Sequence, residues 1–333
     1  MKMPPSLGRF FCLLLINAGF FAAASRTFAA DAPDKTTVII VVGAAGEPEY
    51  GSNFLQWSQL WVDAAHKGNA TVTVIGTSPT NDSSVSDLEQ LQQALAAQPK
   101  QSDNELWIVM LGHGTFDGRT AKFNLRGPDF TPDDMAGWLK PFKRPVAIID
   151  CSSASSPFLT KLSAPGRVII TATRSGSEQN FARFGQYISE AIADPAADLD
   201  KDGQTSLLEA FLVGSRRLAE FYKGQGRLMT EHALIDDNGD GQGTPPDWFK
   251  GIHAVKRARG GATVDGMRAH QFILIRSAAE QQLAPAVRTR RDELELAVGQ
   301  LRDKKSTMNE DDYYRQLEPM LTELAKISTQ KNP

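Results

Sequence analysis

Short runs of apolar residues alternate with stretches of helical spacing along residues 36–192. A strand of a parallel sheet is buried on both faces and therefore has a continuous apolar sequence, and helices supply the crossovers between such strands. The expected strands are the mostly apolar or β-branched segments 37–43, 70–75, 106–111, 146–149 and 167–171, of which 106–111 and 146–149 are wholly apolar. This pattern predicts an α/β fold in three layers, with a mostly parallel central sheet between two layers of helices.

Helices are expected where apolar residues recur at steps of three and four, at 54–65, 85–97, 132–142 and 181–192. With 333 residues, 41% of them hydrophobic, the chain is long enough to bury a substantial core. Its formal net charge of −3 and the lack of a basic tract argue against nucleic-acid binding.

The first 29 residues have the pattern of an export signal. Lys2 and Arg9 precede an apolar stretch at 10–24, and small residues follow up to Ala29. A membrane anchor is the alternative, but the stretch is shorter than the roughly 20 residues that a span needs. We expect a signal peptide at 1–29, a periplasmic or secreted protein, and no membrane span in the mature chain.

Two reactive side chains follow predicted strands. His113 comes after the run 106–111 and Cys151 after the run 146–149, where the carboxyl ends of parallel strands bring functional groups together. An imidazole can activate a thiol and then protonate a leaving amine, and the N–H groups of Gly114 and Cys151 could form an oxyanion hole. The alternative is that Cys151, the one cysteine of the mature chain, is simply a small buried residue.

The sequences LGHG at 111–114 and IIDCSSASS at 148–156 resemble the two signature segments of clan CD cysteine peptidases, which include caspases, legumains and bacterial relatives. The resemblance covers about 36–195. It implies a caspase-like fold, with His113 as general acid/base, Cys151 as nucleophile, and Gly114 and Cys151 in the oxyanion hole. Ser152 and Ser153 depart from it, because caspases have Gly two residues after the cysteine and legumains have Glu directly after it.

Polar residues after the run 167–171 are candidates for a substrate pocket. They are Arg174, Ser175 and Glu178. Ligand-binding groups gather beyond the carboxyl ends of such strands, although charged residues of a solvated loop would have the same pattern.

The segment 198–209, DLDKDGQTSLLE, has the spacing of an EF-hand calcium loop. Carboxylates stand at positions 1, 3 and 5, Gly203 allows the turn at position 6, and an acidic residue stands at position 12. Thr205 replaces the usual aliphatic residue at position 8. The alternative is an acidic turn that caps the following helix. The predicted calcium ligands are Asp198, Asp200, Asp202, Gln204 and Glu209.

A second acidic loop begins at Asp236, with Asn238 and Asp240 at positions 3 and 5. Position 12 is Asp247, but the prolines at 245–246 prevent a normal exiting helix. This loop is either a half-site completed by other oxygen atoms or an Asn-Gly turn.

After about residue 277, apolar residues recur at heptad-like steps on both sides of the capping signal 307–310. This predicts a helical hairpin that packs on the core or mediates self-association. The predicted organisation is a signal peptide at 1–29, a caspase/legumain-like domain at 36–195, a calcium-loop extension at 196–276 and a hairpin tail at 277–333.

We therefore expect a cysteine-type endopeptidase that acts on peptide or protein substrates outside the cytoplasm, with calcium and without an organic cofactor. Two alternatives stay open. One is an inactive calcium-binding scaffold or interaction protein on a peptidase-like fold. The other is a transpeptidase, in which an amine competes with water for the thioester.

Overall fold

The computed structural model describes residues 1, 35–78, 85–260 and 263–330. The predicted signal peptide at 1–29 lies outside these residues, apart from Met1. Within them, no helix has the length and apolar character needed to cross a lipid bilayer. The described residues from Lys35 onward belong to one compact unit, which contains the sheet, the two acidic loops and the C-terminal helices.

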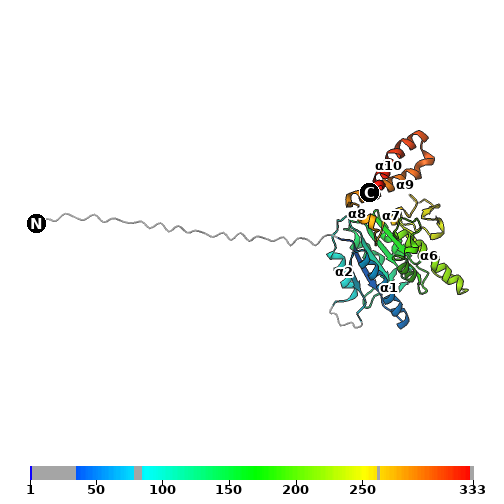
Figure 1. Ribbon diagram of the computed structural model, residues 1–333. Helices are drawn as coiled ribbons and strands as arrows, with labels where there is room; N and C mark the ends of the chain where they lie inside the picture. The colour runs from blue at the N-terminus through cyan, green and yellow to red at the C-terminus, as the bar shows by residue number, and fades with distance from the viewer. Residues whose placement is uncertain (2–34, 79–84, 261–262, 331–333) are drawn as a thin grey trace. The chain divides into compact units, whose positions relative to one another are not determined.

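A six-stranded sheet lies at the centre of this unit, with strand order β2-β1-β3-β6-β7-β8 (Figure 1). The first five of these pair in parallel, and β8 pairs antiparallel with β7. Their bounds are β1 Thr37–Val42, β2 Thr71–Ile75, β3 Leu106–Leu111, β6 Val146–Asp150, β7 Arg167–Thr171 and β8 Leu234–Asp236. The predicted mostly parallel sheet is confirmed.

Helices cover both faces of the sheet because its central strands are apolar on both sides. In β1, Val38, Ile40 and Val42 belong to one apolar cluster, and Ile39 and Val41 belong to the other. The first cluster includes side chains of α1 (Pro48–Lys67), α5 (Phe184–Ala191) and α6 (Leu207–Gly224). The second includes those of α2 (Asp87–Ala97), α3 (Pro132–Leu139) and α4 (Ser156–Leu162). The three-layer α/β architecture is therefore confirmed.

Helix starts follow local capping chemistry. Ser86 and Glu89 form a capping box at the start of α2, Ser206 and Glu209 form one at the start of α6, and α3 begins in the same way. The helix predicted at 54–65 begins earlier, at Pro48, because proline suits the first turn of a helix.

Two short ribbons lie outside the main sheet. β4 (Gly114–Phe116) and β5 (Ala121–Phe123) form a hairpin directly after His113, and Asp117 accepts hydrogen bonds from two N–H groups in its turn. The second ribbon pairs β9 (Phe249–Lys250) with β10 (His253–Ala254).

The C-terminal part is helical, with α7 (Met267–Gln271), α8 (Ala278–Gln282), α9 (Pro285–Lys304) and α10 (Glu310–Gln330). The last two lie side by side in the orange-to-red part of Figure 1, where Arg290 of α9 pairs with Glu323 of α10 at 2.8 Å. The predicted helical hairpin is confirmed. Its second helix is capped by Asn309, which accepts from the Asp311 N–H at 2.9 Å, and not by Thr307, whose hydroxyl bonds back to the preceding helix.

Candidate functional site

The sheet places His113 and Cys151 at the same edge. β3 and β6 are neighbours in parallel, and Met110 of β3 lies opposite Asp150 of β6. Cys151 directly follows β6, and His113 stands two residues after β3. The predicted position of both residues at the carboxyl ends of neighbouring strands therefore agrees with the structure.

The His113 imidazole is held among aromatic rings. Its ring makes edge contacts with Tyr50 and Phe54, at centroid distances of 5.1 and 5.2 Å, and lies 5.9 Å from Phe181. Its Nε2 lies 3.1 Å from the Ala45 carbonyl oxygen. A carbonyl only accepts, so Nε2 carries the proton, and Nδ1 is then the atom that can take up a proton.

Cys151 points into the apolar core. Its residue surface is 0% exposed, and it belongs to the cluster that contains Ile149 and Phe184. Burial raises the pKa of the thiol well above its ordinary value, and the carboxyl groups of Asp150 and Glu231 raise it further. A nucleophilic cysteine requires the opposite, a thiolate in an exposed, electropositive setting.

The two N–H groups predicted for the oxyanion hole already have acceptors within the protein. The Cys151 N–H donates to the Met110 carbonyl at 2.9 Å, because the β3–β6 ladder continues one residue past β6. The Gly114 N–H donates to Ser153 Oγ at 3.2 Å, and that hydroxyl donates back to the Gly114 carbonyl. In this conformation, then, the expected oxyanion hole is not assembled.

A buried polar cluster, which the sequence motifs did not indicate, lies at the end of β6. Asp150 Oδ1 accepts from the Ser152 N–H at 3.0 Å and from its hydroxyl at 2.6 Å. Burial raises the Asp150 pKa to about 7 despite these two bonds, and no residue in the described part of the chain forms a hydrogen bond with its buried Oδ2. Nearby, the Ser155 and Thr173 hydroxyls bond to each other at 3.1 Å. The only sequence signal was the run of polar residues after an apolar strand.

The predicted pocket residues Arg174, Ser175 and Glu178 lie in the loop after β7. The Glu178 carboxylate accepts from the Arg174 N–H at 3.0 Å and lies 2.6 Å from His232 Nδ1. Its backbone carbonyl accepts from the Ala154 N–H at 2.8 Å. Glu178 therefore joins this loop to the segment after Cys151, and its role in a substrate pocket stays a prediction.

In the first acidic loop, the side chains at positions 1, 3 and 5 turn inward. Asp198 accepts from the N–H groups of Lys201 and Gly203, at 2.6 and 3.1 Å. Asp200 accepts from the Asp202 N–H, and Asp202 accepts from the Gln204 N–H. Carboxylate oxygens of the three aspartates lie within 4.8 Å of one another. Lys201 and Gly203 have φ of 64° and 89°, as so tight a turn requires.

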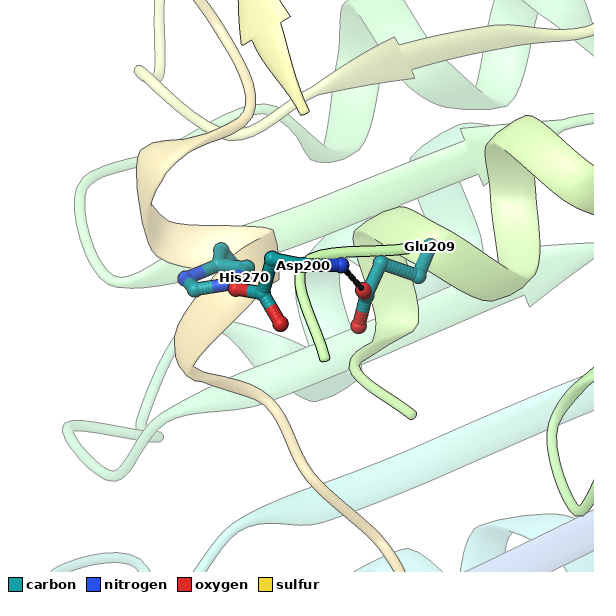
Figure 2. Close-up of side chains that lie close together, drawn as sticks. All are labelled: Asp200, Glu209 and His270. Carbon is teal, nitrogen blue, oxygen red and sulfur yellow. Dashed lines mark hydrogen bonds and ion pairs between the residues drawn. The ribbon is translucent and has the colours of Figure 1, made fainter. Parts of the chain in front are cut away.

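Glu209, at position 12, closes this loop. Its Oε1 accepts from the N–H groups of Leu199 and Asp200, and its Oε2 accepts from the N–H and hydroxyl of Ser206. Figure 2 shows Asp200 with Glu209 on one side and His270, from α7, on the other. His270 Nε2 lies 2.9 Å from Asp200 Oδ2. Sequence spacing gave no signal for His270, which comes from a distant segment.

The second acidic loop repeats these hydrogen bonds. Asp236 accepts from the N–H groups three and five residues later, those of Gly239 and Gly241, at 3.0 and 2.9 Å. Asn238 and Asp240 each accept from the N–H two residues later. The two glycines have φ of 81° and 74°, at the positions of Lys201 and Gly203 in the first loop.

Asp265 closes the second loop. Its Oδ1 accepts from the N–H groups of Asp237 and Asn238, at 2.9 and 3.2 Å, and its Oδ2 accepts from the Thr244 hydroxyl at 2.5 Å. These are the second, third and ninth loop positions, the same three that Glu209 contacts in the first loop. Asp247, which stands at position 12, is exposed in a 3-10 helix at 246–248. Spacing could not reveal Asp265, because it lies far along the chain.

Both loops contain a buried carboxylate at the closing position, although Asp200 and Asp202 of the first loop are exposed. Asp236 and Asp265 are 1% and 3% exposed, and no ion pair within the described ranges includes either of them. Burial raises the pKa of Asp202 and Asp236, and burial together with Asp237 raises that of Asp265 to about 8. Buried carboxylates are costly unless they are paired or coordinate a metal. Clustered oxygen ligands of this kind fit Ca²⁺, a hard cation.

No protein-family model matches the chain, and no curated protein matches it. Among solved structures, it is similar to the Drosophila initiator caspase Dronc, with 14% identity over 62% of this chain and 81% of that chain, and a TM-score of 0.40. It is also similar to caspase-1 from Spodoptera frugiperda, with 11% identity over 61% of this chain and 86% of that chain, and a TM-score of 0.38.

Proposed function

We propose that this chain is an exported calcium-binding protein, built on a caspase-like α/β fold, that acts as a scaffold or interaction protein. The observation that carries the proposal is the repeated geometry of the two acidic loops. Each places a side-chain oxygen at positions 1, 3 and 5, and each is closed by a buried carboxylate, Glu209 in one and Asp265 in the other.

The electrostatics of the loops support a divalent cation. Each added carboxylate makes the next one harder to ionise, and a bound cation reverses that effect. Extracellular calcium modules bind with dissociation constants of roughly 10⁻⁴ to 10⁻³ M, and the export signal predicted at 1–29 would place this chain where calcium is abundant.

The sheet edge supports a binding role over hydrolysis. Cys151 is turned into the core, and the N–H groups of Gly114 and Cys151 are engaged by protein acceptors. Peptide hydrolysis needs a thiolate and donors that are aimed at the developing oxyanion. In this conformation, neither requirement is met.

Thermal unfolding with CaCl₂ and with EDTA tests the calcium proposal. Calcium at a hundredfold excess over its dissociation constant stabilises the folded state by about 2.7 kcal/mol, which would raise the Tm by several degrees. Asp198→Asn and Asp236→Asn should each reduce that shift, whereas Asp247→Asn, at an exposed position outside the closed loop, should leave it unchanged. Equal Tm values in calcium and in EDTA would refute calcium binding.

A cysteine-type peptidase is the second candidate, favoured by the position of His113 and Cys151 beyond neighbouring parallel strands. In that reaction the Cys151 thiolate attacks the substrate carbonyl, His113 protonates the leaving amine, and water releases the acid from the thioester. A transpeptidase would transfer the acyl group to an amine instead. Either reaction requires the segment after β6 to move so that the thiol leaves the core.

Cleavage of a peptide library by the full chain and by Cys151→Ala separates the two candidates. Cleavage that disappears in the variant would establish the peptidase. Absence of cleavage in both proteins, with and without calcium, would support the scaffold.

A further inference from the structure

The short helix α7 is joined to the second acidic loop at its first turn. Asp265, which closes that loop, stands two residues before Met267, the first residue of α7. In return, the carboxylate of Asp237, inside the loop, accepts from the N–H groups of Gly266 and Ala269 at 2.9 and 2.8 Å. The loop and the start of α7 therefore hold each other in place.

The other end of α7 contacts the first acidic loop. His270 Nε2 lies 2.9 Å from Asp200 Oδ2, as Figure 2 shows. Directly after α7, the Phe272 carbonyl accepts from the N–H of Leu207, the first residue of α6, at 2.8 Å. One helix of five residues thus lies between the two loops.

α7 also contacts the C-terminal hairpin. Met267 packs on Gly299 of α9 so closely that an added Cβ there would lie 1.8 Å from the Met267 Cε. Gln271 Nε2 donates to the Asp292 carbonyl at 2.8 Å. A cavity of about 300 Å³ beside these contacts is lined by Asp265 and His270 as well as by α9 residues. The hairpin therefore docks on the helix that the loops position.

A second route leads from the first loop to α9 through α8. Gln204 Oε1, in the loop, accepts from the Ser277 N–H at 3.0 Å, and Ser277 caps α8. Glu280 of α8, 1% exposed, pairs with Arg291 of α9 at 2.7 Å. Because this carboxylate is buried, breaking the pair would leave an uncompensated charge, which makes the contact sensitive to the position of α8.

We propose that cation binding at the two acidic loops fixes α7 and α8 and thereby locks the hairpin α9–α10 onto the extension. This inference rests on the calcium binding proposed above. When the cation is removed, repulsion among the clustered carboxylates loosens the loops, and the Asp237 contacts at the start of α7 loosen with them. α9 then loses the surface on which it docks.

Amide hydrogen exchange of the full chain, measured by mass spectrometry in CaCl₂ and in EDTA, tests this coupling. Calcium should slow exchange in α9 by about tenfold or more, because local opening governs exchange in such elements. Amides of α2, a helix that packs on β2 at the opposite edge of the sheet from β8, should change much less. Calorimetric titration of the same sample with CaCl₂ records binding independently.

The two measurements distinguish the failures. If calcium binds but α9 exchanges equally fast in both buffers, the coupling is wrong and the calcium proposal stands. If calcium produces neither heat nor a change in exchange, both proposals are wrong. Slower exchange in α9 together with binding heat supports both.

Variants of Gln271 and Gln282 sharpen the test without altering a proposed ligand. Gln271→Ala removes the bond to the Asp292 carbonyl, so calcium should bind as before while the protection of α9 by calcium falls severalfold. Gln282→Ala, at an exposed position in α8, should keep the full protection. Equal protection in the two variants would contradict a role for the α7–α9 contact, and wild-type binding heat would show that Gln271→Ala is folded.

Discussion

Buried carboxylates lie both at the end of β6 and in the two acidic loops, but their surroundings differ. Among the described residues, Asp150 has one hydrogen-bond partner, Ser152, on Oδ1 and none on Oδ2. In the loops, Asp236 and Asp265 each accept several hydrogen bonds and lie near further carboxylates. At the end of β6 a single carboxyl group is paired with a neutral serine. In the loops, several carboxyl groups lie close together and accept from backbone N–H groups.

A single buried carboxyl group and a cluster of them differ in whether they favour a bound cation. A protonated carboxylic acid at the end of a strand is stable alone, since burial removes its charge. In the second loop the N–H donors offset burial only in part, and burial together with neighbouring carboxylates raises the pKa of Asp236 and Asp265. A bound cation would stabilise the ionised form of these carboxylates. Asp150 at the end of β6 therefore needs no bound ion, whereas a cation would stabilise the carboxylates of the two acidic loops.

The largest expected effect concerns the Cys151 thiol. In a Cys12→Ala chain, Cys151 is the one remaining cysteine. Its alkylation by iodoacetamide at pH 8 should be at least about 10³-fold slower in the native protein than in denaturant, because reaction must await opening of the core. Mass spectrometry of quenched time points gives both rates.

A native rate close to the denatured rate would contradict the closed sheet edge and favour the peptidase. The matched control is a peptide with the sequence of residues 146–156, which should react as fast as the unfolded chain.

The next effect is a pH dependence from Asp150. Its folded pKa of about 7 lies above the ordinary value of 3.8, so the folded state holds this proton more tightly than the unfolded state does. The resulting stability is complete below about pH 4 and is lost as pH rises through 7, with a slope of at most ~1.4 kcal/mol per pH unit.

Denaturant unfolding of wild type and Asp150→Asn between pH 4 and 8 isolates this contribution, because the other titrating groups cancel in the difference. The wild type should lose stability relative to the variant as pH rises. A difference that does not change with pH would show that Asp150 ionises in the folded protein as it does in water.

A smaller effect is expected at Gly114, where an added Cβ would lie 2.1 Å from the Ser153 carbonyl oxygen. Gly114→Ala should destabilise the protein by about 2 kcal/mol, because backbone on both sides would have to move. The control is Gly137→Ala in α3, where a Cβ meets nothing within 4 Å and helix propensity favours alanine by about 1 kcal/mol. Equal unfolding midpoints for the two variants would show that the serine segment is free to shift.

Much of the fold could be predicted from the sequence because its strands are long enough to carry a pattern. β1, β2, β3, β6 and β7 each coincide with an apolar or β-branched segment, apart from Asp150 at the end of β6 and Arg167 at the start of β7. β4, β5 and β8 are three residues long, too short for periodicity to mark them. Their pairing depends on tertiary contacts that no local pattern encodes.

The sites could be predicted only where the chemistry is local. The ligand spacing of the first loop is contained in one segment of twelve residues, and Glu209 lies within it. Asp265 and His270 join their loops across long sequence separations, so spacing could not find them. Alternate residues of a strand face the same side of the sheet, so Cys151 is expected on the same face as Ile149. Only the three-dimensional structure shows that Phe184 and Gly185 of α5 cover that face.

The smallest expected effect tests whether Asp265 serves the second loop as Glu209 serves the first. Asp265→Asn keeps an oxygen that can accept from the Asp237 and Asn238 N–H groups, while it removes one negative charge. Calcium affinity of that loop should fall by about tenfold, because the amide cannot supply the negative charge of the carboxylate. The calcium-free protein should be as stable as wild type or more so, because a buried carboxyl group with its pKa raised to about 8 is replaced by a neutral amide. Titration calorimetry and EDTA unfolding curves measure the two quantities, with Asp247→Asn as the control that should change neither. If Asp265→Asn instead binds calcium as wild type does, Asp265 only anchors the loop backbone. The second loop would then resemble the first at positions 1 to 9 but would have no counterpart to the predicted calcium ligand Glu209.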